Sequence, residues 1–201
     1  LMLLDHMPDR GQAQQLKVEL LRSVMAGTLA SELSHTNKEA EQAYIGALFR
    51  NLGRLLVAFY LPEDAEQIRT QAKARTSDVT LADEAAVSAD VLGMSYDELG
   101  QQIGAKWGLP DTVLQCMAMP ADKIPTRSLA GRPERMTWLA SLANDGAETI
   151  LNTEPVNLSD ELGTLTERYA RALDLTPQAL LEAAGRARKR MTEMTDALNM
   201  T

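Results

Sequence analysis

The segment AYIGALFRNLGRLLVAFY, residues 43–60, decides the fold class of this chain. Apolar residues occur on nearly all sides of a helix drawn through it, so neighbouring helices must cover it all round. Thr36 followed by Glu39 is a capping-box pattern that predicts the start of this helix, and Pro62 stops it after Tyr60. The segment therefore predicts a buried helix over residues 36–60.

The hydrophobic pattern outside this segment also has the helical period, and no apolar and polar residues alternate over a run long enough to predict a strand. Ser95 with Glu98 is a second capping box, and Gly108 stands at a helix-stop position. Further helices are expected over residues 12–33, 62–75, 80–93, 95–107, 110–119, 132–151, 159–173 and from 176 to the C-terminus. The predicted fold class is all-α.

Composition and charge narrow the class of protein. The chain is 45% hydrophobic, which is enough to bury a core. No stretch approaches the roughly 18 unbroken apolar residues that a membrane span needs. The single cysteine, Cys116, cannot form an internal disulfide, and no signal-peptide pattern is present, which favours the cytoplasm. A formal net charge of −8 disfavours nucleic acid and anionic membranes as partners.

Side chains that commonly carry catalysis are few. The two histidines, His6 and His35, have no metal-ligand spacing to each other or to cysteine. Cys116 lies on an apolar stripe without a base that would activate it. We therefore expect no cofactor and no metal site of nitrogen and sulfur ligands. A magnesium or manganese site made of carboxylates alone stays an alternative, built for instance from Asp83, Glu84 and Asp97.

Two parts of the sequence resemble known families. The segment GALFRNLGRL, residues 46–55, is similar to the stretch that reads GLLHDIGKL in HD-superfamily phosphohydrolases. Glu84, the segment YDELG at residues 96–100 and the segment WGLP at residues 107–110 resemble the Glu, His-x-x-Leu-Gly and Trp-x-Leu-Pro elements of the HDOD family. The order and spacing of these elements identify residues 12–120 as similar to HDOD domains, which are catalytically degenerate relatives of the phosphohydrolases.

This resemblance implies an HD-like multi-helix bundle with additional C-terminal helices. Residues 1–120 would form the HDOD-like helical core, without the N-terminal part of the family domain, and residues 121–201 a C-terminal helical extension. HDOD domains occur in bacterial signalling proteins and generally lack metal chemistry. We therefore expect a non-catalytic regulatory module that binds other signalling protein domains in the bacterial cytoplasm.

Positions that hold metal ligands in the related enzymes are substituted in this sequence. Arg22 stands at an upstream His position, Arg50 and Asn51 replace the His-Asp pair, and Tyr96 replaces a later His. A further His expected near residues 120–121 is also missing. The resemblance therefore implies that metal-dependent phosphohydrolase activity is lost, although such an activity stays an alternative.

The arginine substitutions suggest a second alternative, a sensor of small anionic ligands. If Arg22 and Arg50 both face the former metal cavity, their guanidinium groups suit a phosphate, a nucleotide or a carboxylate. The alternative is a purely structural role, in which Arg50 pairs with a buried acid such as Glu84 or Glu98, or extends to water.

Overall fold

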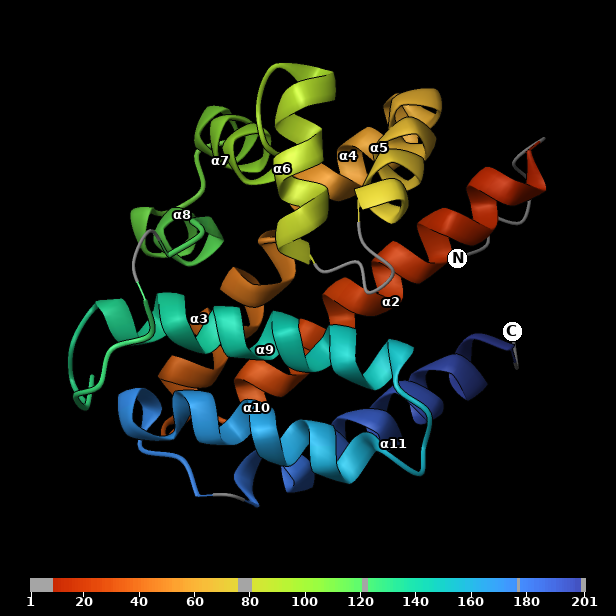
Figure 1. The fold of residues 1–201 in the computed structure, drawn as a ribbon. Helices are drawn as coiled ribbons and strands as arrows, with labels where there is room; N and C mark the ends of the chain where they lie inside the picture. The colour runs from red at the N-terminus through yellow and green to blue at the C-terminus, as the bar shows by residue number, and fades with distance from the viewer. Residues whose placement is uncertain (1–8, 76–80, 121–122, 177, 200–201) are drawn as a thin grey trace.

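The computed structural model describes residues 9–75, 81–120, 123–176 and 178–199, and every regular element in these ranges is an α-helix (Figure 1). The predicted all-α class is confirmed. The helices are α2 (Arg10–Glu32), α3 (Asn37–Phe49), α4 (Leu52–Tyr60), α5 (Pro62–Arg75), α6 (Leu81–Leu92), α7 (Tyr96–Lys106), α8 (Asp111–Met117), α9 (Glu134–Asn152), α10 (Leu158–Leu173) and α11 (Ala179–Asn199).

The largest core cluster lies between α2, α3, α9, α10 and α11. Leu29 of α2 and Leu139 and Leu142 of α9 are completely buried in it, together with Leu162 and Leu180 from the last two helices. Alanines line the contacting faces and let the helix axes approach closely. The packing is thus continuous across residue 120, while the domain boundary predicted there stays a prediction.

A smaller core cluster lies among α4, α5, α6 and α7. It contains Val57, Ile68 and Val87, which are 1% exposed or less, and the ring of Tyr96. Figure 1 shows these four helices on one side of α9 and the pair α10 and α11 on the other. The N-terminal half of α2 reaches toward α4, where Leu16 packs on Ala58. The molecule therefore has two main apolar clusters, and α2 extends from the larger one toward α4; Leu16 with Ala58, and Leu52 with Val113 and Met117, form two minor ones.

The helix predicted over residues 36–60 is in fact two helices, and this part of the prediction is wrong. The helix α3 ends at Phe49 and α4 begins at Leu52, with Asn51 leaving helical geometry at φ −87° and ψ 5°. The bend brings Gly53 against α7, where an added Cβ would lie 1.9 Å from the carbonyl oxygen of Tyr96. A tertiary contact therefore overrides an uninterrupted apolar pattern.

The two predicted capping boxes differ in outcome. Ser95 and Glu98 exchange both hydrogen bonds at the start of α7, as predicted. At α3, Thr36 accepts from the Glu39 amide, but the Glu39 carboxylate accepts from the amide of His35 rather than from that of Thr36. Gly108 follows α7 with φ +74°, a left-handed conformation that explains why glycine stands there.

Candidate functional site

Charged side chains are buried where α2 passes between the two apolar clusters. Glu19 and Arg22 are 2% and 6% exposed and lie one turn apart on α2. Arg54 enters from α4 and is 9% exposed. Isolated charges are costly in such surroundings, so each must have a partner of opposite sign.

An ion-pair network supplies these partners. The Oε2 atom of Glu19 lies 3.1 Å from Nε of Arg54 and 3.3 Å from Nε of Arg22. Arg54 also pairs with Glu84 of α6, and Arg22 with Glu148 of α9. We call these five residues the buried ion-pair network. It connects α2, α4, α6 and α9, and therefore ties the two apolar clusters together.

The contacts inside the network are ion pairs rather than aligned hydrogen bonds. Glu19 Oε2 and Arg22 Nε approach each other without hydrogen-bond geometry, although both atoms are buried. Burial and the neighbouring charge of Arg54 lower the pKa of Arg22 to about 10, so Arg22 is still protonated at neutral pH. Three carboxylates thus face two guanidinium groups, which leaves no surplus positive charge for an anion.

Tyr96, predicted at a former metal-ligand position, borders the network. Its ring centroid lies 5.8 Å from Cζ of Arg54, in cation–π range. Burial raises the pKa of the Tyr96 hydroxyl. Two of the four predicted site residues, Arg22 and Tyr96, are therefore gathered around Arg54.

Asn51 lies outside the charged network and bonds to a second buried amide. Its Nδ2 donates to Oδ1 of Asn144 on α9 at 2.6 Å. Nδ2 of Asn144 in turn donates to the carbonyl oxygens of Ala47 and Ala140, at 3.2 and 2.8 Å. This pair satisfies backbone and side-chain groups at the bend between α3 and α4, so it holds that bend against α9.

Arg50 points to another part of the molecule. It is half-buried, and its Nη1 donates to the carbonyl oxygen of Ala118 at 3.1 Å, at the C-terminal end of α8, where a cation is favourable. Burial raises the pKa of Asp97 and of Asp145, and the positive charge of Arg50 partly opposes this rise. Among the described residues, Arg50 and Arg22 share no contact, and Glu84, considered above as a partner of Arg50, pairs with Arg54 instead.

The other predicted candidates are scattered. Within the described ranges, no group of three His, Cys, Asp or Glu side chains could hold a metal ion, so the carboxylate trio of Asp83, Glu84 and Asp97 is not assembled. Nε2 of His35 lies 3.3 Å from Nη2 of Arg135, a buried residue of α9. Cys116 is buried, which raises the pKa of its thiol to about 11. His6 and residue 121 lie outside the described residues.

Sequence reasoning missed Glu19, Arg54 and Glu148 as members of the site. Two signals were available: Arg54 interrupts the most apolar segment of the chain, and Glu19 precedes Arg22 by one helical turn. No pattern in the sequence marks Glu148, because its pairing with Arg22 depends on how α9 packs against α2.

Comparison with known proteins assigns the family. The HDOD domain family matches residues 9–122, which are more than half of the chain and include α2 to α8. Neither the curated proteins nor the solved structures give a match. None of the helices within the described residues is both long and apolar enough to cross a membrane. With the family match added to the all-helical bundle and the two sequence elements, this chain belongs to the HDOD domain family.

Proposed function

We propose that this chain is a non-catalytic regulatory module of a bacterial signal transduction pathway, which works in the cytoplasm by binding other protein domains. The observation that supports this most is the buried ion-pair network. The resemblance implies that Arg22 stands where the related hydrolases carry a metal-ligating histidine, and its charge is balanced by Glu19 and Glu148.

The chemistry of these side chains disfavours a divalent cation at this place. A guanidinium group has no lone pair to give to a metal and repels it electrostatically. The carboxylates that could attract a cation are already paired with Arg22 and Arg54. Such a network stabilises one arrangement of α2, α4, α6 and α9, which suits a scaffold that presents surfaces to partners.

The same network disfavours an anion sensor that uses Arg22. Three glutamates surround the two arginines, and an incoming phosphate would have to displace Glu19 or Glu148 from a buried pair. We therefore do not place a small anionic ligand at the former metal position.

A hydrolysis assay tests the non-catalytic part of the proposal. The native chain is incubated with p-nitrophenyl phosphate and bis-p-nitrophenyl phosphate in the presence of Mn²⁺, Mg²⁺ or Fe²⁺, next to an active HD phosphohydrolase. The proposal predicts no turnover above the no-protein blank. Turnover that saturates with metal and grows with enzyme concentration would overturn it.

The interaction part has its own test. The tagged chain is cross-linked in a bacterial host that naturally encodes it, and captured proteins are identified by mass spectrometry. The proposal predicts a signalling protein whose capture is competed by untagged chain and retained with purified components. If no captured protein binds the purified chain, the interaction role is wrong.

A further inference from the structure

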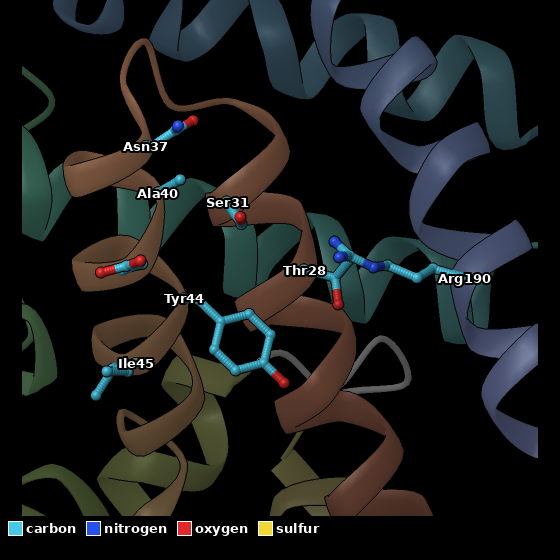
Figure 2. Close-up of a pocket in the computed structure, with 8 residues that line it drawn as sticks. Thr28, Ser31, Asn37, Ala40, Tyr44, Ile45 and Arg190 are labelled. Atoms are coloured by element: carbon cyan, nitrogen blue, oxygen red, sulfur yellow. The ribbon is translucent and has the colours of Figure 1, made fainter.

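A groove of about 550 Å³ lies between α2, α3 and α11, away from the buried ion-pair network (Figure 2). Its volume falls within the range of small-molecule binding sites. The residues that line it are Thr28, Ser31, Asn37, Ala40, Glu41, Tyr44, Ile45 and Arg190.

The floor of the groove depends on a close approach of α2 and α3. A Cβ atom at Gly27 would lie 3.0 Å from the carbonyl oxygen of Tyr44 and 3.1 Å from two of its ring carbons. Glycine at this position lets the aromatic ring lie against α2. Figure 2 shows the Tyr44 ring face-on, between Ile45 and Ala40 on one side and Arg190 on the other. The ring therefore offers a flat apolar surface to a ligand.

One wall of the groove carries a guanidinium group that is only loosely paired. Glu32 on α2 bonds to Nε of Arg186 at 2.5 Å, and its other oxygen lies 3.7 Å from Nη1 of Arg190. Arg186 also lies 4.0 Å from Glu182 on its own helix, whereas Arg190 has only the long contact with Glu32 and is the more weakly held of the two. Figure 2 shows the Arg190 side chain reaching from α11 toward Thr28. An anionic group in the groove would find a guanidinium donor there.

Several polar groups around the groove are not used by the fold. Within the described part of the chain, the side chains of Ser31, Asn37, Glu41 and Tyr44 form no hydrogen bond or ion pair. Thr28 differs, because its hydroxyl donates to the carbonyl oxygen of Val24 at 2.8 Å. The groove therefore combines a cation, an aromatic face, and a carboxylate that can accept hydrogen bonds.

We propose that this groove binds a nucleoside monophosphate whose base carries an exocyclic amine. The phosphate pairs with Arg190 and accepts from the Ser31 hydroxyl. The base lies on the ring of Tyr44, because aromatic side chains are favourable stacking surfaces for bases. The carboxylate of Glu41 accepts a hydrogen bond from the exocyclic amine. The base thus meets two side chains that the fold leaves unpaired, and the phosphate takes Arg190 from its long contact with Glu32.

Calorimetric titration of the native chain with AMP tests this inference. Adenosine and ribose 5-phosphate serve as probes of the two halves of the ligand, and we expect each to bind at least tenfold more weakly than AMP. Arg190→Ala should weaken AMP binding roughly tenfold or more, as expected for losing a charged hydrogen bond. Lys189→Ala removes the same charge from the next position, where the side chain is 80% exposed and outside the groove, and should change affinity less than twofold.

A second variant tests recognition of the base. Glu41→Gln should weaken AMP and strengthen IMP, because the amide can donate to the base carbonyl that replaces the amine. Circular dichroism shows whether each variant keeps the helical fold.

Four results would overturn the inference: no saturable binding of AMP at millimolar concentration, AMP affinity unaffected by Arg190→Ala, equal affinity for ribose 5-phosphate and AMP, or a base preference that Glu41→Gln does not change. The outcome is independent of the hydrolysis assay, since the groove shares no residue with the buried ion-pair network.

Discussion

Replacing Arg54 by methionine removes the residue through which the buried ion-pair network reaches α6 and Tyr96 of the smaller apolar cluster. Arg54 contacts Glu19, Glu84 and the ring of Tyr96, and its side chain is 10% exposed. In the variant, Glu19 keeps Arg22 as a partner, but Glu84 loses its ion pair while only 14% of its side chain is exposed. Methionine fills much of the volume, so the main effect is an unpaired buried carboxylate.

The expected loss is large for a single substitution. Breaking a buried ion pair by removing one partner costs about 3–5 kcal/mol, and the partial exposure of Glu84 places the value near the lower end. For a chain of this size, a loss of about 3 kcal/mol lowers Tm by roughly 6–12 °C. Urea unfolding followed by circular dichroism measures the free energy of unfolding directly.

Two comparisons make this prediction specific. Arg75→Met breaks a pair with Asp90 in which both side chains are at least half exposed, and should cost less than about 1 kcal/mol. The double variant Arg54→Met/Glu84→Gln removes the unpaired charge. Its loss in free energy of unfolding should be smaller than the summed losses of the two single variants by roughly 1 kcal/mol or more. If Arg54→Met costs no more than Arg75→Met, the reasoning about a buried network is refuted.

Three further predictions concern packing, pH dependence and thiol reactivity. Gly53→Ala should lower the free energy of unfolding by about 3 kcal/mol or more, because its Cβ would press on α7, whereas Gly163→Ala, with open space around it, should raise that free energy by roughly 0.5–1 kcal/mol; urea unfolding distinguishes them. Burial raises the pKa of Asp145, so the native chain loses stability as pH rises from about 4 through that pKa; Asp145→Asn should therefore gain stability relative to the native chain over this range, and a flat difference between pH 4 and 7 would contradict this. The Cys116 thiol, with a pKa of about 11, should react with Ellman's reagent at pH 8 only after unfolding, and rapid reaction of the folded chain would show that it is accessible.

Local signals in the sequence were sufficient to predict most helices. The capping box at Ser95 and the glycine at 108 bracket α7 within one residue of its observed ends. Such signals depend on hydrogen bonds between residues a few positions apart, so a single sequence displays them. The bend at Asn51 was missed because its cause, the contact of Gly53 with Tyr96, joins residues from different helices.

The candidate site was predictable only in part, for a related physical reason. The resemblance pointed to Arg22 and Tyr96, and an arginine within an apolar helix signalled a buried charge. The sequence could not show that Arg50 extends toward the end of α8 while Arg54, one turn later, extends toward Glu19 in the interior. The rotation of α4 after the bend decides between the two, and this depends on packing against α7. Nothing in the sequence pointed to Glu148, because its partner Arg22 lies far away in the sequence and the two meet only when α9 packs on α2.

Metal content tests the central claim most directly. The native chain is expressed with manganese, iron and zinc supplied, purified without chelators and examined by elemental analysis, with the Arg50→His/Asn51→Asp variant as a comparison. Since Arg22 and Arg54 already pair with the carboxylates of the buried ion-pair network, the account predicts no more metal in the native chain than in a buffer blank. Stoichiometric metal that survives purification would contradict the account and favour a metal-dependent phosphohydrolase instead.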